Sequence, residues 1–372
     1  MKSKINEKMF ISSKNIKRSA GFSLLEVMVA MVIFMIVTAA IFGLLQAGRV
    51  DKSRTSTRTD MLKNARVAVH LIGRDALNAG LGYHKIGGVV PDDFLSTRFG
   101  NPTDVDDNKD LLPSVMGGDN RFSNDLLPNT TDKTDTMVFA FRDVDFNNGE
   151  AIELLSVSNP TGDPATPRVK TKKANGAANT SNFDLYLLES STSQIAVMVT
   201  ATNQTNEIDF KPNDPVGLNL PLNGIGKNSS LLRACATADD ENCTTYSFAS
   251  LKRFYLVSYK IKQDGTLVRI TYGNNRGKPS AEQIVEQPLA YNVQNMQIKY
   301  VLENGTVTEN PAAGPDGIGG TADDDARQFN QVRQITVTLK VLSTEIDEMT
   351  RKPEVVTLSS TFSTRNLEYD AG

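Results

Sequence analysis

The stretch KRSAGFSLLEVMVAMVIFMIVTAAIFGLLQAGR, residues 17–49, decides the fold of this chain. Between Arg18 and Arg49 it holds one charged residue, Glu26. The apolar run from Phe22 to Ala47 is long enough to cross a hydrocarbon core of about 30 Å as a helix. A carboxylate inside such a helix carries a penalty of roughly 2.5 to 3.5 kcal/mol on insertion scales, so Glu26 is a candidate functional residue.

The charge of the chain is divided unevenly between its start and its remainder. The 372 residues carry a formal net charge of -3, yet the first 21 residues are strongly basic, so an acidic body follows a basic leader. Length allows one or two domains with a sizeable core. The body has no basic stripe of the kind that phosphate backbones require, so nucleic acid is not expected as a main partner.

The basic leader and the apolar run together predict a single-pass membrane topology. The positive-inside tendency places the leader in the cytoplasm and the rest of the chain outside the inner membrane. A cleaved secretory signal peptide and a plain uncleaved anchor are the alternatives. However, a secretory signal is cut after its apolar stretch, whereas the small-residue junction here, Ala20-Gly21, precedes it.

The segment GFSLLEVMVAMVIF resembles the signal of type IV prepilins and of type II secretion pseudopilins. In that resemblance Gly21 ends the leader, Phe22 is the first mature residue and Glu26 is the fifth. It implies that a membrane-embedded prepilin peptidase cuts after Gly21 and methylates the new N-terminus of Phe22. The resulting division is a cleaved leader, 1–21, and a transmembrane and assembly helix, 22–49.

Helical periodicity continues beyond the membrane run, over residues 50–80. Apolar residues there recur at steps of three and four, which predicts an amphipathic half of the same helix, about 85 Å long in all, lying against a sheet. Gly80 and Gly82 are expected to end it. The residues of the stripe are Leu62, Ala65, Val69, Ile72 and Ala76.

A second resemblance, to the PilW-like minor pilins, lies in two further segments. NARVAVHLIGRDALNAGLGYH, residues 64–84, matches the arginine-bearing helix that ends in an Asn-Ala-Gly break. The end of the chain, residues 332–369, matches a strand pair that closes on an Arg-Asn dipeptide, here Arg365-Asn366. Together these two segments hold 59 of the 372 residues, about a sixth of the chain.

Residues 81–372 read as one β-rich domain with long loops, periplasmic or extracellular. Residues 254–272 and 293–310 each give strand runs around a tight turn, Asp264-Gly265 and Asn304-Gly305. Earlier strands are expected in 135–144, 151–157 and 183–190. A helix followed by sequential strands predicts an α+β fold, with the long N-terminal helix packed on an antiparallel sheet as in pilins.

The residues offer little for catalysis, and we expect no enzyme. His70 and His84 have no metal-ligand partners at useful spacing, and no nucleophile motif is present. Cys235 and Cys243, in CATADDENC, are expected to form a disulfide outside the inner membrane. No cofactor is expected apart from Ca²⁺ at one of three acidic loops, 104–110, 143–150 and 316–325. The third is favoured, through Asp316, Asp323, Asp324 and Asp325.

These features predict a PilW-like minor pilin that primes or caps type IV pilus assembly. The expected partners are prepilin peptidase, other minor pilins, the major pilin and, before assembly, the inner membrane; afterwards the protein would be at the pilus and cell surface. A J-type minor pseudopilin of type II secretion is the nearest alternative. A pilus-associated adhesin or DNA-uptake subunit is a third.

Overall fold

The computed structural model describes the chain from Gly21 onward, with gaps. The described residues exclude 1–20, 84–86, 92–93, 101–108, 159–166, 191–193, 220–232, 235–243, 246–247, 315–324, 348–349, 365–366 and 368–372. Two compact units are present, 1–56 and 57–372. The boundary falls inside the predicted amphipathic segment, so the last turns of the helix belong to the β-rich unit.

The helix α1 runs without interruption from Leu24 to Asn78. The predicted helix, Phe22 to about Ala79, is confirmed to within two residues at each end. Its buried positions begin at Met61. Of the predicted stripe, Ala65, Val69, Ile72 and Ala76 are buried, whereas Leu62 is only partly covered.

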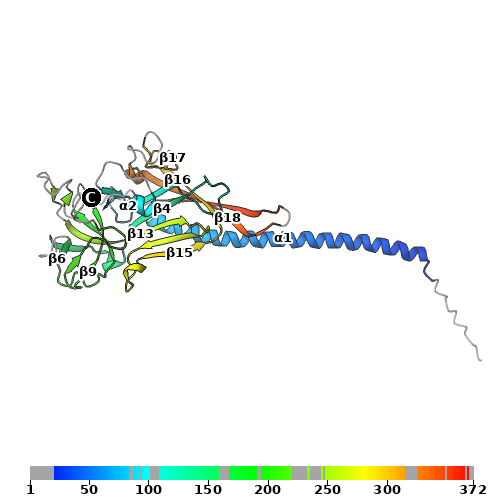
Figure 1. Ribbon diagram of the computed structural model, residues 1–372, viewed down its shortest axis with the longest axis horizontal. Helices are drawn as coiled ribbons and strands as arrows, with labels where there is room; N and C mark the ends of the chain where they lie inside the picture. The colour runs from blue at the N-terminus through cyan, green and yellow to red at the C-terminus, as the bar shows by residue number, and fades with distance from the viewer. Residues whose placement is uncertain are drawn as a thin grey trace, which may run out of the picture. The chain divides into compact units, whose positions relative to one another are not determined.

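Most strands belong to one large sheet, thirteen-stranded as far as the described residues show (Figure 1). Its central path is β2-β1-β8-β7-β13-β5-β6-β10-β9, and β13 also pairs with β4 and β14. The strands are β1 (Gly88–Pro91), β2 (Lys109–Leu112), β3 (Val115–Phe122), β4 (Thr134–Arg142), β5 (Ile152–Ser158), β6 (Arg168–Thr171), β7 (Leu185–Ser190), β8 (Gln194–Met198), β9 (Ala201–Thr202), β10 (Glu207–Asp209), β13 (Phe248–Ile261), β14 (Leu267–Tyr272) and β15 (Ile284–Ala290).

Two smaller sheets complete the β-structure. The four-stranded sheet has the order β17-β16-β18-β19. Its strands are β16 (Val293–Leu302), β17 (Val307–Thr308), β18 (Val332–Ile346) and β19 (Pro353–Ser363); β11 (Arg233–Ala234) and β12 (Thr244–Thr245) form a separate pair. The short helices are α2 (Phe94–Phe99) and the 3-10 turns η1 (Phe146–Gly149), η2 (Ser280–Glu282) and η3 (Ala326–Gln331).

The predicted α+β architecture is confirmed, with one refinement of the sheet. Strands were found in each predicted segment, and both hairpin turns place glycine at positive φ, +79° at Gly265 and +82° at Gly305. The sheet is not wholly antiparallel, because β1 runs parallel to β8, with Gly88 opposite Gln194. Parallel neighbours need a long connection, and here the residues between β1 and β8 supply it.

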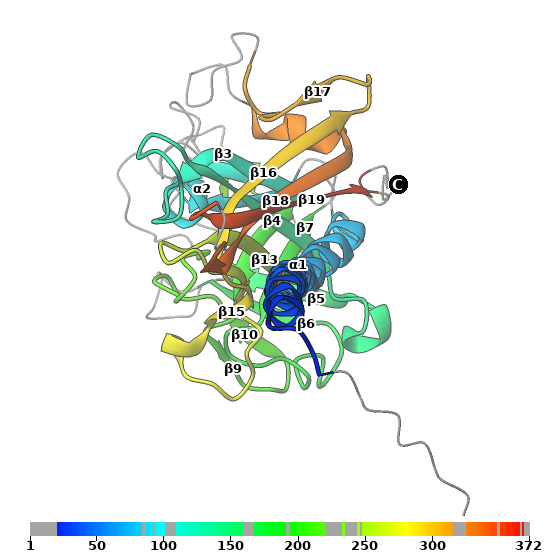
Figure 2. The ribbon, with the colours of Figure 1, turned by 90° about the vertical axis from the view of Figure 1, so that its right-hand side faces the viewer.

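Hydrophobic residues from α1, the thirteen-stranded sheet and the four-stranded sheet share one core. A smaller core lies around β5, β6 and β10. Figure 2 shows β16, β18 and β19 as a layer of their own. Buried polar side chains join this layer to β4. Thr134 Oγ1 donates to the Met296 carbonyl at 3.1 Å, and Asp135 accepts the Ile298 N–H at 2.7 Å. Burial raises the pKa of Asp135 to about 7, against two backbone hydrogen bonds that lower it.

Candidate functional site: the N-terminal helix

The start of α1 is built as a capping box. Ser23 Oγ accepts the N–H of Leu25 at 3.3 Å, and Glu26 Oε2 accepts the N–H of Ser23 at 3.0 Å. Serine followed three residues later by glutamate is the sequence signature of this cap, in which two otherwise unsatisfied N–H groups are paired reciprocally. The carboxylate also lies at the positive end of the helix dipole. The spacing of Ser23 and Glu26 is the sequence signal for this role, but the apolar run around Glu26 drew attention only to its charge.

The predicted processing residues lie directly before this cap. Gly21, Phe22 and Ser23 are outside the helix, and the side chain of Phe22 is 87% exposed. No described atom lies within 4 Å of the position that a Cβ would occupy at Gly21. The peptide bond between Gly21 and Phe22 therefore lies outside the helical part of α1.

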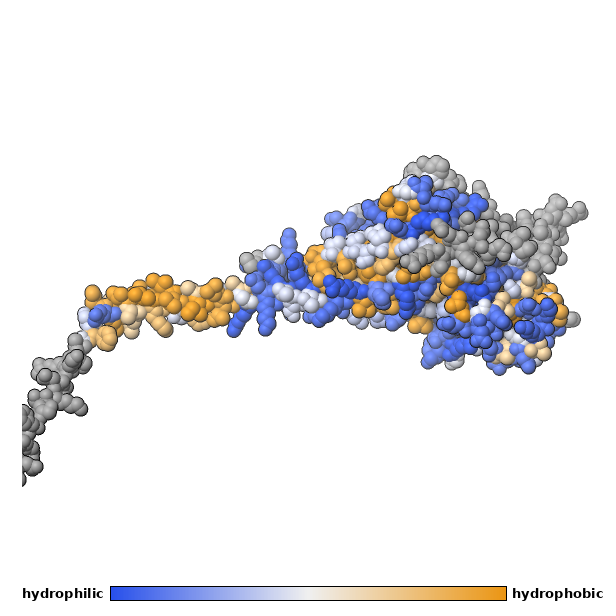
Figure 3. Space-filling view, turned by 180° about the vertical axis from the view of Figure 1, so that it is seen from behind, coloured by the Kyte–Doolittle hydropathy of each residue, from blue (hydrophilic) through white to orange (hydrophobic). Residues whose placement is uncertain are grey.

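The first turns of α1 carry apolar side chains on every face. Large hydrophobic residues from Phe22 to Leu45 are exposed around the whole circumference, and Figure 3 shows them as a continuous apolar surface. By length and composition this helix can cross a membrane, although a signal sequence has the same properties. A helix that is apolar all round needs surroundings other than water, in a membrane or among other helices.

After the apolar turns, α1 first carries exposed charged side chains. From Met61 onward it packs against the β-rich unit to which these turns belong. In the β-rich unit the docking centre is Asp75, whose side chain is 1% exposed. Its Oδ2 accepts the Tyr259 hydroxyl at 2.6 Å and Arg269 Nε at 2.7 Å, and Arg74 pairs with Oδ1 at 3.1 Å. Burial and the neighbouring Asp75 raise the pKa of Tyr259, which stays a neutral donor. The sequence did not predict this anchor, because a charged residue next to the predicted apolar face of a helix is normally exposed to solvent.

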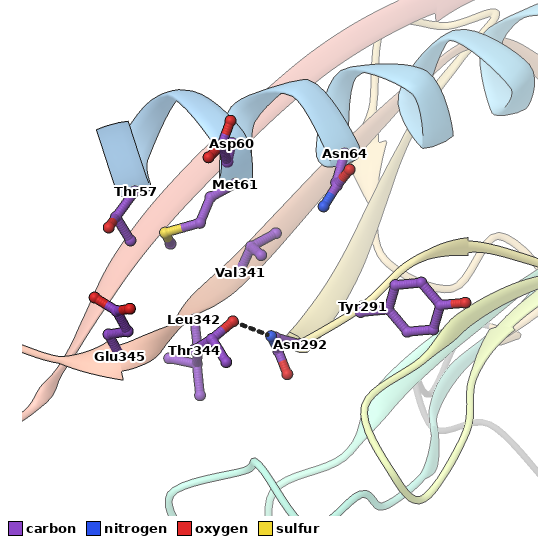
Figure 4. Close-up of a pocket in the computed structure, with 10 residues that line it drawn as sticks. All are labelled: Thr57, Asp60, Met61, Asn64, Tyr291, Asn292, Val341, Leu342, Thr344 and Glu345. Carbon is purple, nitrogen blue, oxygen red and sulfur yellow. Dashed lines mark hydrogen bonds between the residues drawn. The ribbon is translucent and has the colours of Figure 1, made fainter. Parts of the chain in front are cut away.

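A cavity of about 350 Å³ lies where α1 meets the end of β18 (Figure 4). Met61 and Asn64 point from α1 toward β18, and Asn292 donates to Thr344 Oγ1 at 3.1 Å. Hydroxyl, amide and carboxylate side chains line the cavity together with the apolar Met61, Val341 and Leu342. Its lining residues are Thr57, Asp60, Met61, Asn64, Tyr291, Asn292, Val341, Leu342, Thr344 and Glu345.

The predicted calcium ligands are only partly described. Asp325 begins η3, and its Oδ1 accepts both the N–H and Nε of Arg327, at 2.9 and 2.8 Å. Burial raises the pKa of Asp325, but these hydrogen bonds outweigh it and lower the pKa overall. Asp316, Asp323 and Asp324 lie outside the described residues. In the second acidic loop, Asp143 is buried in an ion pair with Arg253 at 3.0 Å.

Other predicted site residues fall in the gaps of the description. Cys235, Cys243, His84 and Arg365-Asn366 lie outside the described residues. His70 is exposed on α1. Among the residues that the structure describes, no group of three or more His, Cys, Asp or Glu side chains could hold a metal ion.

Comparison with known proteins identifies the N-terminal segment. The prokaryotic N-terminal methylation motif matches residues 16–42, which include Gly21, Phe22 and Glu26. No curated protein and no solved structure matches the chain. The motif supports a type IV pilin or pseudopilin. It implies processing by prepilin peptidase and assembly with other pilins, and with the apolar helix it fits a membrane-anchored subunit.

Proposed function

We propose that this protein is a PilW-like minor pilin, a structural subunit that primes or caps a type IV pilus together with other minor pilins. The observation that carries the proposal is the N-terminal segment. The methylation motif, the Gly21–Phe22 bond directly before α1 and the apolar coat of the first turns of α1 occur together in this segment. Such a coat is stable first in the inner membrane and later among the helices of neighbouring subunits.

In this function Gly21 and Phe22 are the processing residues and Glu26 is the assembly residue. Cleavage after Gly21 creates a positive amine on Phe22, one helical turn from the carboxylate. In low dielectric an ion pair is much stronger than in water, and an unpaired buried carboxylate is costly. Glu26 has one oxygen bonded to the Ser23 N–H, so its second oxygen is the acceptor that we assign to the amine of an adjacent subunit.

The β-rich unit is assigned to the periplasm before assembly and to the cell surface afterwards. We propose that its role is structural rather than catalytic, as expected of a pilin subunit. Two accessory features belong to the proposal, a Cys235–Cys243 disulfide and Ca²⁺ binding by the loop that includes Asp323 and Asp324. Oxygen ligands in a glycine-rich turn suit this hard cation.

The test is to isolate sheared surface filaments and membranes from the same cells and to sequence the protein's N-terminus in each by mass spectrometry. A chain that begins with N-methylated Phe22 in the filament fraction, and that is lost there when the major pilin is deleted, is the expected result. Recovery only with secretion components would favour the J-type pseudopilin. Recovery with the leader still attached in every fraction would contradict both.

A further inference from the structure

The second edge of β19 is unpaired within the described part of the chain. β19 pairs with β18 alone, in a register that places Gln334 opposite Ser363. One step further, the Thr364 N–H donates to the Arg333 carbonyl at 3.0 Å. Because hydrogen-bonded and non-hydrogen-bonded pairs alternate in an antiparallel ladder, the even-numbered residues of β19 bond to β18. The odd-numbered ones direct their N–H and C=O groups to the free edge: Val355, Thr357, Ser359, Thr361 and Ser363.

This edge lacks the features with which proteins usually protect an unpaired strand. The run VVTLSSTFS, residues 355–363, contains no charge, proline or glycine. By contrast, β15 carries Pro288, a register shift opposite Leu267, and Glu286 in an ion pair with Lys262. At the other end of the β19 sheet, β17 has only two residues. Prolines, charges, bulges and short length all block the addition of a strand, and β19 has none of them from Val355 to Ser363.

The inward face of β19 carries three apolar side chains that are only partly covered. Val356, Leu358 and Phe362 pack against the core but are half-buried. At one end Arg58 of α1 pairs with Glu354, and at the other the Phe362 ring lies where a Cβ on Gly73 would be. Fifteen helical residues and eight strand residues both span roughly 25 Å, so β19 runs alongside α1 in the same direction (Figure 1).

The outer face of this strand carries hydroxyl groups that are held in place by β18. Thr361 and Thr336 share a hydrogen bond of 2.9 Å between their hydroxyls, and Ser359 and Thr338 share one of 3.0 Å. The edge is therefore a regular ladder with an apolar side, an uncharged polar side and free backbone groups between them.

We propose that β19 accepts a β-strand from a different protein chain, which extends the four-stranded sheet along α1. Only an extended segment can satisfy a row of alternating N–H and C=O groups. The absence of charge over residues 355–363 selects an uncharged strand. Its residues on the α1 side are apolar at alternate positions, to complete the cover of Val356, Leu358 and Phe362, and those on the other side are polar.

The added strand comes from a different chain rather than from a second copy. Two copies joined by a two-fold axis through β19 pair antiparallel, so their α1 segments would point in opposite directions. In a pilus all subunits have the same polarity along the filament axis, which excludes such a pair. This step depends on the proposed function, whereas the free edge itself does not.

Three substitutions on adjacent residues test the edge. Ser359→Pro removes an N–H that points to the free edge, and Ser359→Ala keeps that N–H while removing the same hydroxyl. Ser360→Pro removes an N–H that bonds to β18. We expect Ser359→Pro to keep the thermal midpoint of Ser359→Ala but to recover about tenfold less partner from crosslinked membranes, since one interchain hydrogen bond is lost. Ser360→Pro should lower the midpoint by several degrees.

A photo-crosslinking amino acid at Thr357, Ser359 or Thr361 identifies the segment. The expected crosslinks move by two residues at a time along one segment of another chain. Equal partner recovery by Ser359→Pro and Ser359→Ala, or equal destabilisation by the two proline variants, would overturn the proposal. So would crosslinks to the same chain only, or none in a two-residue series. Leader cleavage is followed in the same cells, so that its absence contradicts the proposed function while the crosslink series decides the edge separately.

Discussion

The two compact units differ in the exposure of their apolar side chains. Val37, in the first unit, is 49% exposed, whereas Val337, in the second, is fully buried. Burial of apolar area is worth roughly 25 cal/mol per Å², so the β-rich unit gains this stabilisation from its own core. The described residues of the first unit, 21–56, contribute to no such core, so they must obtain this stabilisation from a membrane or from other helices. The comparison separates residues that act through the fold from residues that act through the surroundings.

The largest effect is expected at Gly21. Gly21→Leu should abolish leader removal, because a bulky side chain then precedes the scissile bond, while the β-rich unit keeps its thermal midpoint. An immunoblot of membranes would show only the precursor. Leu24→Ile, within the same segment, is the matched control and should be cleaved. Normal cleavage of Gly21→Leu would refute the assignment of this bond.

Glu26 distinguishes an assembly role from a capping role. Glu26→Val should leave cleavage and the fold of the second unit unchanged but reduce co-purification with other pilins about tenfold or more, as expected for losing an ion pair in low dielectric. Ser23→Ala removes the other half of the cap, at a cost of about 1 kcal/mol to the helix start. If both variants reduce assembly equally, Glu26 acts as a cap and not through a neighbouring amine.

A substitution at Asp75 should affect the stability of the second unit only. Asp75→Ala leaves Tyr259 and Arg269 without their shared acceptor and should lower the free energy of unfolding by about 3 to 5 kcal/mol. Denaturant unfolding of the detergent-solubilised protein measures it. Asp60→Ala, on the same helix, breaks only an exposed pair with Lys63 and should cost less than about 1 kcal/mol. Equal losses would show that Asp75 is not the anchor of α1.

The two cysteines test whether the second unit lies outside the inner membrane, where a disulfide can form. β11 and β12 pair Ala234 with Thr244, the residues that flank Cys235 and Cys243 in the sequence, and we predict a disulfide between these two cysteines. A disulfide there should contribute about 2 to 3 kcal/mol, because the loop is short. Thiol labelling without reductant should find no free cysteine, and reductant should lower the thermal midpoint of the second unit only. Two labelled thiols would contradict the predicted location outside the inner membrane.

The smallest effect is expected from Ca²⁺. A ligand that binds only the folded state stabilises it by about 1.4 kcal/mol at a tenfold excess over Kd. The thermal midpoint should therefore rise between chelator and millimolar Ca²⁺, and Asp323→Ala combined with Asp324→Ala should remove the rise. A midpoint that is the same with chelator and with Ca²⁺ would eliminate this site, without bearing on the first unit.

The sequence by itself determined the helical structure of the described part of the first unit. A run from Phe22 to Ala47 without charge except Glu26 permits one structure in a membrane, a helix, because every backbone group must be bonded within the segment. The strands around Asp264-Gly265 and Asn304-Gly305 were equally predictable, since local turn chemistry sets such hairpins.

Only the tertiary structure determined the features that depend on contacts between residues far apart in the chain. The parallel pairing of β1 with β8, the burial of Asp75 and the open edge of β19 each depend on residues far apart in the chain. Asp75 has the local sequence of an exposed helix residue, and only Tyr259 and Arg269, nearly 200 positions away, make it an anchor. Likewise, β-propensity predicts β19 as a strand but not whether its second edge has a partner, because pairing is settled by which strands the fold places beside it.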